Sequence, residues 1–493
     1  MVNIIRSGDA IELSLMSVAA LPATATAEVD SLFAAQRRAF SADPNPSFAA
    51  RRDRLTRLLA LTERHEDEII RAIDADFSAR AAQETRLAEL FVIGAGIRHA
   101  RRHLKSWMAE RRVPTGLHFR PGYNRLLRQP LGVVGVVSPW NYPLQLALGP
   151  TLAALAAGNR VMMKPSELTP RFAELLQQLI ADRFAADEVV VVTGDAELGR
   201  HFVSLPFDHL CFTGSTAVGR LVAQAAAANL TPVTLELGGK SPVIVDVSAD
   251  LAVAAQRIAY GKLLSAGQTC IAPDYLLVPQ GQAEAMALAL AAAIKQLYPR
   301  IQGNQDYTAI ISPRHHARLL DLLAEARDSG ARILTVAPEG EVVPPESRRL
   351  PPTLVLRPGP TTRLMREEIF GPILPILEYE SLDAAIAMVN AGTRPLALYW
   401  FGSDIANRDR VLRETISGGV TINDCLCHLA QEDQPFGGVG ASGIGAYHGE
   451  WGFRSFSKEK PVFHQARRNF LPLLYPPYGR VFDAVMALIR RIT

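Results

Sequence analysis

The chain has 493 residues, of which 48% are hydrophobic and 20% are charged, a composition that excludes a disordered protein. Its 52 Lys and Arg residues against 49 Asp and Glu leave a formal charge of +3, which is too balanced for a protein devoted to binding nucleic acid. Four cysteines are too few for a disulfide scaffold, so we expect reduced thiols and a cytoplasmic location.

Two terminal segments bear on that location. Residues 13–27 combine an apolar run with small residues, as a secretory leader does, but Asp9 and Glu12 stand where such a leader is positively charged. Residues 1–27 are therefore either a leader or a disordered segment. Val481–Ile489 is apolar but too short to cross a bilayer, which needs ~20 residues. We expect no transmembrane segment, and an amphipathic helix there, docked on the protein or in weak contact with a membrane.

The first elements are helical. Apolar residues recur at helical spacing from Phe48 to Ala75, and a longer helix is expected from about Glu84 to Arg111. The next segment, His118–Gln129, is rich in Arg and lies between two prolines, which predicts an extended and exposed strand.

Beyond this segment, short apolar runs alternate with helical patterns, which is typical of parallel sheets covered by helices. The first set of predicted elements is Val133–Val137, Leu144–Ala157, Val161–Lys164, Pro170–Phe184, Val189–Val192, Leu198–Leu205, His209–Phe212, Ala217–Ala228 and Val233–Leu237. The second set is Pro242–Val245, Leu251–Leu264, Leu276–Val278, Ala283–Leu297, Ala317–Ser329 and Ile333–Val336. The fold class is therefore α/β, with two doubly wound, Rossmann-like domains that meet near Gly238–Gly239. Ligands of such domains bind at the carboxyl ends of the strands.

Two motifs at strand ends could bind a nucleotide. Gly214–Gly219 opens a helix, so its glycines could let a pyrophosphate approach the helix N-terminus, although a turn capped by Ser215 explains the pattern equally well. Lys164 and Glu167 could hold ribose hydroxyls, and a solvated ion pair is the simpler alternative.

Three further motifs carry reactive or polar side chains. Asn141 lies between two prolines beyond a strand, where its amide either donates to an oxyanion or forms a rigid turn. Glu236 lies near the end of a strand, and Cys270 lies in a Gly-Gln-Thr turn, where an exposed thiol can act as a nucleophile beside a carboxylate. Glu368 and Phe370 lie on a turn that could meet a ribose and a flat heterocycle, or could be an ordinary turn.

The other cysteines have simpler interpretations. Cys211 lies in an apolar strand and is expected to pack in the core. Cys425 and Cys427 have His428 beside them but no second pair of ligands, so we expect thiols in a loop and no metal site.

Taken together, the motifs resemble those of the NAD(P)-dependent aldehyde dehydrogenase superfamily, and the similarity runs from about Leu55 to Lys458. The similar stretches are Pro139–Pro143, Lys164–Glu167, Gly214–Gly219, Glu236–Lys240, Gly267–Cys270, Glu368–Pro372 and Pro435–Gly445. The resemblance implies that Cys270 is the nucleophile, that Glu236 is the general base, and that Asn141 forms the oxyanion hole with the Cys270 amide.

The resemblance also implies NAD as cofactor, with NADP possible. Lys164 and Glu167 would bind the adenosine ribose, and Glu368 would bind the nicotinamide ribose. Gly214 and Ser215 would lie by the pyrophosphate and Phe370 beside the nicotinamide ring. The remaining implied cofactor residues are Gly219 and Trp140.

The implied reaction oxidises an aldehyde to the acid through a hemithioacetal and a thioester on Cys270. Glu236 favours water as the acceptor of the acyl group, because relatives that transfer it to coenzyme A usually lack this glutamate. From another class, a catalytically silent binding protein on the same fold is the alternative, but it would have no use for Cys270, Glu236 and Asn141 together. A thiol hydrolase without cofactor would leave Lys164 and Glu368 without a role.

A narrower resemblance concerns the class 3 branch, through Cys270–Tyr275 and Asn423–Gly445. Within this branch, His428–Phe453 is most similar to the bacterial coniferyl aldehyde dehydrogenases, which oxidise phenylpropenal aldehydes. The implied substrate is an aromatic aldehyde of this kind, and the alternative is a medium- or long-chain aliphatic aldehyde. The substrate stays open because of three departures from the branch, which are Ala266, Cys425 and Cys427.

The resemblance also implies a division of the chain. Residues 1–117 and 131–238 would form the NAD-binding domain, and residues 239–426 would form the catalytic domain. Residues 118–130 and 427–493 would form a bridging element and tail, and the molecule would be a homodimer.

Overall fold

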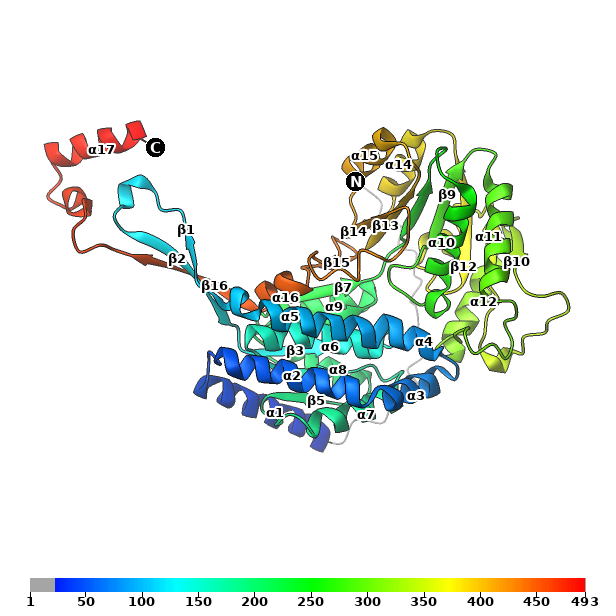
Figure 1. The fold of residues 1–493 in the computed structure, drawn as a ribbon, viewed down its shortest axis with the longest axis horizontal. Helices are drawn as coiled ribbons and strands as arrows, with labels where there is room; N and C mark the ends of the chain where they lie inside the picture. The colour runs from blue at the N-terminus through cyan, green and yellow to red at the C-terminus, as the bar shows by residue number, and fades with distance from the viewer. Residues whose placement is uncertain (1–22, 493) are drawn as a thin grey trace, which may run out of the picture.

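The computed structural model describes residues 23–492. The prediction of a leader or disordered segment at residues 1–27 therefore falls almost entirely outside the described residues. Helix α1 (Ala23–Ala42) is the first described element. Figure 1 shows two α/β bodies side by side and, at one end, a thin arm of strands that leads to the C-terminal helix.

The first body is built on a six-stranded sheet in the order β15-β7-β6-β3-β4-β5. Its five parallel strands are rich in Val, Met and Leu, and nearly all of their side chains are buried, as a sheet covered on both faces requires. This result confirms the predicted strands. The strands are β3 (Val133–Val137), β4 (Arg160–Lys164), β5 (Val189–Val191), β6 (His209–Gly214), β7 (Val233–Leu237) and the short antiparallel β15 (Gly443–Ile444).

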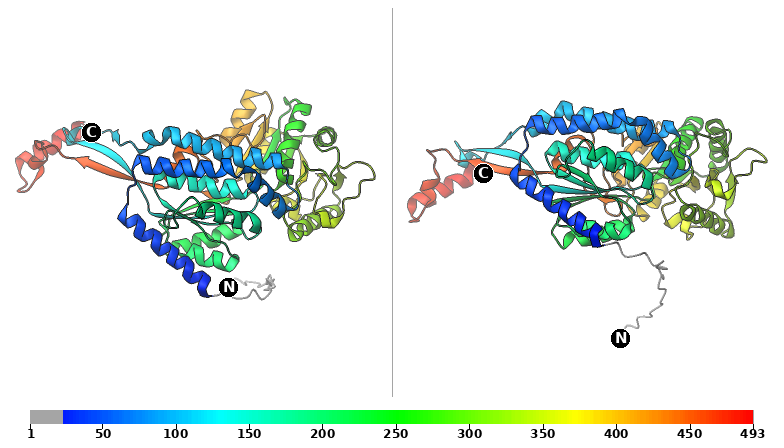
Figure 2. Two further views of the ribbon diagram at one scale, coloured as in Figure 1. Left: turned by 60° about the horizontal axis from the view of Figure 1, so that its bottom comes forward. Right: turned by 90° about the horizontal axis from the view of Figure 1, so that it is seen from below.

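Helices cover both faces of this sheet (Figure 2). One face packs against α2 (Phe48–Arg64), α3 (Glu66–Phe77), α5 (Val92–Met108), α6 (Pro143–Ala157) and α7 (Pro170–Ala181). The other face packs against α1, α8 (Ala196–Ser204) and α9 (Thr216–Ala227).

Two predicted helices are each divided in the structure. The helix predicted from Phe48 to Ala75 is broken at His65, whose backbone leaves the helical region, so that α2 and α3 are separate. The helix predicted from about Glu84 to Arg111 contains α4 (Ala82–Thr85), a π-helical segment at Arg86–Phe91 and α5. No proline or glycine marks either change in the sequence.

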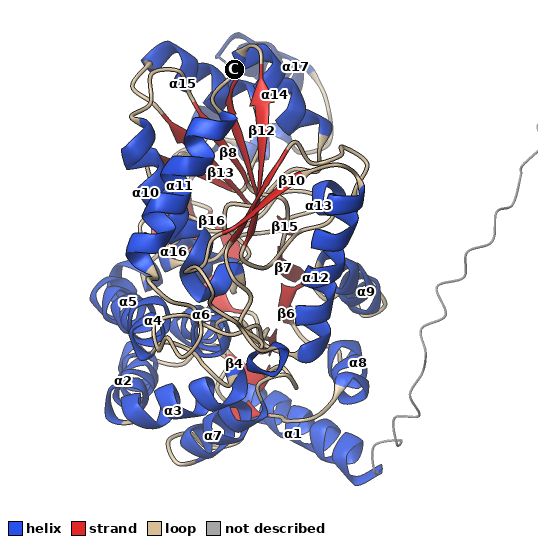
Figure 3. Ribbon diagram, turned by 90° about the vertical axis from the view of Figure 1, so that its right-hand side faces the viewer, coloured by secondary structure: helices blue, strands red, loops and turns tan. Residues whose placement is uncertain are grey.

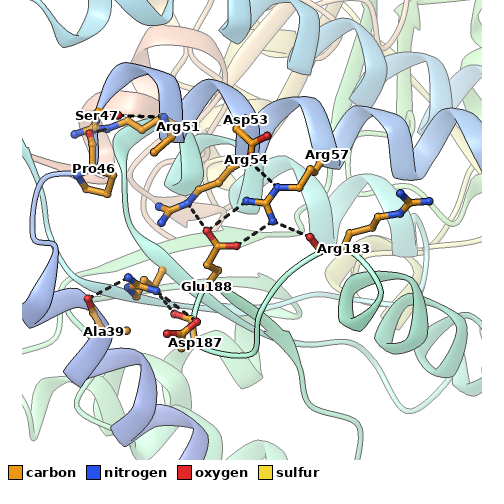
Figure 4. Close-up of polar contacts among 12 residues, drawn as sticks. Ala39, Pro46, Ser47, Arg51, Asp53, Arg54, Arg57, Arg183, Asp187 and Glu188 are labelled. Carbon is orange, nitrogen blue, oxygen red and sulfur yellow. Dashed lines mark hydrogen bonds and ion pairs between the residues drawn. The ribbon is translucent and has the colours of Figure 1, made fainter.

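Charged contacts fix the N-terminal helices to the first sheet (Figure 4). Two arginines of α2 reach the turn before β5, where Arg54 Nε lies 3.0 Å from Glu188 Oε1 and Arg57 Nη1 lies 2.9 Å from Glu188 Oε2. Arg57 also donates to the Arg183 carbonyl oxygen at 2.7 Å. The helical layer is therefore an integral part of the domain.

The second body is built on a seven-stranded sheet in the order β10-β11-β12-β9-β8-β13-β14, and only the edge strand β10 is antiparallel. The strands are β8 (Pro242–Val245), β9 (Tyr275–Pro279), β10 (Arg332–Thr335), β11 (Thr353–Leu356), β12 (Ile373–Tyr379), β13 (Ala397–Phe401) and β14 (Gly419–Ile422). Together with the first sheet, this sheet confirms the predicted fold class of two parallel-sheet bodies.

Helices also lie on both faces of the second sheet (Figure 3). One face packs against α10 (Leu251–Leu263) and α11 (Ala283–Leu297). The other face packs against α12 (Pro313–Asp328), α14 (Leu382–Ala391) and α15 (Ile405–Glu414). The one-turn helix α13 (Arg363–Arg366) precedes β12.

A third sheet forms the arm in the order β1-β2-β16. Its strands are β1 (Arg111–Val113), β2 (Tyr123–Pro130) and β16 (Ser457–His464), and the chain ends in α17 (Arg480–Ile492). The segment predicted as extended and exposed, His118–Gln129, is a strand only from Tyr123 onward, begins within a 3-10 helix (Leu117–Phe119), and is mostly half-buried because β1 and β16 pair with it. The predicted C-terminal helix is present as α17. Among residues 23–492, no helix is long and apolar enough to cross a membrane.

Part of residues 427–493, which were expected to form the bridging element and tail, packs on the first body instead. β15 is hydrogen-bonded to β7 of the first sheet, and α16 (Gly449–Ser455) contacts α5 and α6. Residues 443–455 thus belong physically to the first body, because these contacts lie on its sheet and its helical layer. The arm itself contains β2 and the residues that follow α16.

Candidate active site

The carboxyl ends of four neighbouring strands bring polar residues to one edge of the first sheet. Lys164 pairs in register with Val137 of β3, and Glu236 of β7 pairs with Thr213 of β6. Several buried polar atoms at this edge have no hydrogen-bond partner, among them Ser138 Oγ, Thr213 Oγ1 and both carboxyl oxygens of Glu236. Because buried polar groups are normally paired, this edge is suited to a polar ligand or reactant.

Cys270 and Glu236 line one cavity of about 240 Å³ between the two bodies. Both are residues for which the sequence predicts catalytic roles, and the fold brings them to the same space. Apolar and aromatic side chains make up most of the remaining lining, including Leu87, Phe91, Leu146, Tyr260, Leu264, Ile271, Leu396, Leu426, Phe436 and Tyr447. The cavity therefore suits a largely apolar reactant that carries one group for chemistry at a thiol.

Burial raises the pKa of both reactive groups of the cavity. Burial raises the pKa of the Cys270 thiol to about 12, and the nearby carboxylates Glu368 and Glu236 add to that rise. Burial also raises the pKa of Glu236 well above its ordinary value. A raised carboxyl pKa suits a group that later takes up a proton near neutral pH.

The backbone before Cys270 has an unusual conformation. Ser265 and Ala266 are consecutive residues with φ of 53° and 52°, in the left-handed region that favours glycine. Gln268 fixes this turn, since its side-chain amide donates to the carbonyl oxygens of Ser265 and Ala309, both at 3.0 Å, and accepts from the Ile311 N–H. The thiol is thus presented from a turn whose shape is set by surrounding contacts.

Asn141 lies close to this turn, because its side-chain amide donates to the Gln268 carbonyl oxygen at 3.1 Å. Two further residues, which no sequence motif indicated, hold the backbone of Asn141 in place. The Arg80 guanidinium donates to the Asn141 carbonyl oxygen, and it also forms an ion pair of 3.3 Å with Glu89, in which neither side chain is exposed. Glu89 in turn accepts from the Leu144 N–H at 2.7 Å, at the N-terminus of α6.

Nothing in the sequence around Arg80 and Glu89 forms a motif. Between them the chain carries two other charged residues, of which Glu84 is buried and Arg86 is exposed, so charge alone does not single out Arg80 and Glu89. What distinguishes these two residues is that both side chains are completely buried, and this is visible only in the folded structure.

Lys164 and Glu167 lie next to each other at the end of β4. Lys164 Nζ donates to Glu167 Oε2 at 3.1 Å, and the Lys164 side chain is buried whereas that of Glu167 is half exposed. A buried ammonium with an open carboxylate beside it can hold vicinal hydroxyls, so these two residues fit a ribose.

The glycine motif surrounds the N-terminus of α9, as predicted. Ser215 caps this helix by accepting from the Val218 N–H at 3.3 Å, and Gly214 ends β6. Gly219 has a different environment, because a Cβ there would lie 2.5 Å from Leu237 Cδ2. Because Gly219 has no Cβ, α9 can pack closely on Leu237 of β7. This packing directs the helix N-terminus toward the edge of the sheet.

Glu368 lies against Gly238 and Gly239, where the chain passes from the first body to the second. Its Oε1 accepts from the Gly239 N–H at 3.1 Å, and a Cβ on Gly238 would lie 2.1 Å from its Oε2. Phe370 follows with φ of 52°, and its ring lies edge-on to Trp140 with the ring centres 5.4 Å apart. The predicted cofactor residues of this loop therefore lie together, but outside the lining of the cavity that holds Cys270.

The remaining thiols divide as expected between core and loop. Cys211 is fully buried in β6. Cys425 and Cys427 line the same cavity as Cys270, whereas Ala266 is buried in a separate apolar cluster and does not line it. All four cysteines are free, and among residues 23–492 no group of His, Cys, Asp and Glu is arranged to hold a metal ion.

Comparison with known proteins gives concordant matches over most of the chain. The aldehyde dehydrogenase family model matches residues 15–462. A Pseudomonas aeruginosa protein named "Probable coniferyl aldehyde dehydrogenase" is 51% identical over 453 residues, which cover 92% of this chain and 94% of that protein. The "Coniferyl aldehyde dehydrogenase" of a Pseudomonas species is 44% identical over 441 residues, covering 89% and 91%.

One solved structure is also close. It is titled "Substrate bound state of Staphylococcus Aureus AldH", and it is 38% identical in sequence with a TM-score of 0.88. The match covers 93% of this chain and 99% of that one, so both bodies of the fold and their relative placement are shared.

Proposed function

Because the chain belongs to the aldehyde dehydrogenase family, we propose that it oxidises an aldehyde to the carboxylic acid with NAD as cofactor. The observation that carries this proposal is the shared cavity of Cys270 and Glu236, in which a thiol and an unpartnered carboxyl face one apolar space. This pair supplies both a nucleophile and a base for acyl chemistry.

The reaction follows from the chemistry of these side chains. The Cys270 thiol loses its proton to solvent as its sulfur adds to the aldehyde carbon, and the Asn141 amide and the Cys270 N–H stabilise the negative oxygen of the adduct. NAD, when bound, supplies the acceptor for the hydride that this adduct loses, which leaves a thioester on Cys270. Glu236 then takes a proton from water, the water oxygen bonds to the acyl carbon, and the carbon–sulfur bond breaks to release the acid and the Cys270 thiolate, while Glu236 passes its proton to solvent.

The cofactor site consists of this chain's own polar groups at the sheet edge. Lys164 and Glu167 would hold the adenosine ribose, and Gly214 with Ser215 would lie near the pyrophosphate at the N-terminus of α9. Glu368 would hold the nicotinamide ribose. The unpartnered hydroxyls of Ser138 and Thr213 fit this assignment, because a polar ligand would satisfy them.

Other residues would shape the rest of the cofactor site. Phe370 and Trp140 would border the nicotinamide ring, and Gly219 would act by bringing α9 close to the sheet. NADP is the alternative cofactor, since Lys164 could tolerate a phosphate on the ribose.

The substrate that we propose is an aromatic aldehyde of the phenylpropenal type, such as coniferaldehyde. Two relatives named for coniferyl aldehyde are 51% and 44% identical to this chain over 453 and 441 residues. The cavity supports a flat ring, since Phe91, Tyr260, Phe436 and Tyr447 all contribute to its walls.

A medium- or long-chain aliphatic aldehyde is the second candidate, because leucines also line the cavity. Turnover of coniferaldehyde, benzaldehyde, hexanal and dodecanal with NAD and NADP distinguishes the candidates. A kcat/KM for dodecanal above that for coniferaldehyde would contradict the aromatic assignment.

Two variants test the chemistry itself. Cys270→Ala should abolish dehydrogenation while NAD still binds, and measurable turnover by this variant would remove Cys270 from its role. Glu236→Gln should slow thioester hydrolysis more than hydride loss, which appears as a burst of NADH before a slow steady rate. A steady rate equal to that of the wild type would contradict the assignment of Glu236 as base.

We also propose the organisation of the molecule. Residues 1–117 and 131–238 would form the NAD-binding domain, residues 239–426 the catalytic domain, and β2 with β16 an arm that bridges two copies in a cytoplasmic homodimer. The open edges of the three-stranded sheet support such bridging, because unpaired strand edges readily pair with another chain. A molar mass of one chain by light scattering would contradict the dimer.

A further inference from the structure

The C-terminal tail, defined as residues 465–492, has a charge unlike that of the rest of the protein. It contains five arginines and no lysine, and Asp483 is its single acidic residue. Its charge of +4 exceeds the +3 of the whole chain, so the remainder is slightly acidic. The family match ends at residue 462, before the tail begins.

The tail also exposes a dense set of large apolar side chains. Tyr475, Tyr478 and Phe470 are 60%, 68% and 68% exposed, and Val481 and Leu488 of α17 are each 59% exposed. Large apolar side chains are normally buried, so several exposed ones on one short segment indicate a surface that binds another molecule or a membrane.

Helix α17 separates these properties onto two faces. At 100° per residue, its apolar side chains Val481, Phe482, Val485, Met486, Leu488 and Ile489 fall on one continuous arc. Arg480, Asp483, Arg490 and Arg491 fall on the opposite arc. Figure 1 shows α17 at the far end of the arm, away from both α/β bodies of its own chain.

We propose that the C-terminal tail docks the protein on the surface of an anionic phospholipid bilayer. The arginines would meet acidic headgroups, and the apolar arc of α17 would enter the boundary between headgroups and acyl chains, with the exposed tyrosines at the same level. Because no helix of residues 23–492 can span a bilayer, the contact is peripheral. A nucleic acid would neutralise the arginines but leave Val481 and Leu488 in water, so the lipid surface is the better fit.

Sedimentation with vesicles tests this proposal on the full-length protein. The wild type should sediment with phosphatidylglycerol vesicles but not with phosphatidylcholine vesicles, and rising salt should release it. Arg490→Gln with Arg491→Gln should weaken binding about 30-fold, and Val481→Asp with Leu488→Asp should weaken it at least about tenfold.

Matched substitutions elsewhere serve as controls. Arg71→Gln with Arg327→Gln removes two exposed arginines of α3 and α12, and Leu288→Asp changes a leucine of α11 that is 67% exposed. These controls should bind vesicles as the wild type does, and aldehyde turnover in the absence of vesicles should be unchanged in every variant.

Three results would overturn the proposal. The first is no sedimentation with anionic vesicles, or equal sedimentation with both kinds. The second is tighter binding to a short duplex DNA than to vesicles. The third is a change of molar mass by light scattering in the tail variants, which would assign the tail to a contact between copies of this chain.

Discussion

Replacing Lys240 by Met should both destabilise the protein and disturb the loop that carries Glu368. Lys240 Nζ donates to an Asp274 carboxylate oxygen and to the carbonyl oxygens of Leu364 and Glu367, the latter two at 2.9 Å. The second Asp274 oxygen accepts from the Ile369 N–H at 2.8 Å, so the same pair fixes both sides of Glu368.

The expected magnitude follows from the burial of this ion pair. The side chains of Lys240 and Asp274 are 15% and 4% exposed. Removing one partner of a buried pair costs about 3–5 kcal/mol, since the other charge is left without compensation. The partial exposure of Lys240 places its removal at the low end, about 3 kcal/mol.

A double-mutant cycle separates the pair from simple loss of packing. Lys240→Met, Asp274→Asn and the double variant are compared by urea denaturation, together with the KM for NAD. The double variant should be more stable than the sum of the single changes predicts, by about 2 kcal/mol, because neither member of the Lys240–Asp274 pair is then left charged without the other. The KM for NAD should rise more than the KM for aldehyde. Additive losses of stability, or an unchanged KM for NAD, would refute the reasoning.

Further predictions concern three other positions. Burial raises the pKa of the Cys270 thiol to about 12, so its thiolate fraction should rise about tenfold per pH unit from pH 7 to 10. Alkylation of Cys270 by iodoacetamide without cofactor, followed by mass spectrometry of its peptide, should accelerate in the same proportion. A rate that levels off near pH 8 would contradict this prediction. Because the folded state raises the pKa of Glu236, that residue opposes folding increasingly as pH rises above its ordinary value of 4.5. Glu236→Gln should therefore gain stability at pH 8 and not at pH 4, measured by urea denaturation at both. Gly219→Ala should cost about 1–2 kcal/mol in thermal denaturation, because the clash of its Cβ with Leu237 outweighs the gain in helix propensity, and no loss would mean that the Leu237 side chain or α9 moves aside.

The sequence predicted those parts of the fold whose signal is local. The strands Val133–Val137 and Val233–Leu237 have the predicted bounds because a short run of apolar, often β-branched residues between turns is a complete description of a buried strand. Strands β11 to β14 were not predicted. Of these, Ala397–Phe401 carries the same continuous apolar signal and was identifiable, whereas β12 contains Pro375, which obscures it.

The candidate site divides in the same way. Cys270, Glu236 and Asn141 could be proposed from motifs, because each lies in a turn or at a strand end with distinctive neighbours. Arg80 and Glu89 could not be found, since their role comes from distant contacts with Asn141 and the N-terminus of α6. The position of Gly219 against Leu237 is likewise a tertiary contact that no local pattern encodes.

The left-handed turn at Ser265 and Ala266 has a consequence for engineering this protein. Each non-glycine residue in that region costs about 1–2 kcal/mol, so glycine at either position should make the chain harder to melt. The same exchange would widen the range of angles from which the Cys270 sulfur meets an incoming aldehyde. Thermal stability and the fixed orientation of the Cys270 sulfur therefore place opposite demands on this turn. Substitutions meant to stabilise the protein should be made at positions remote from it.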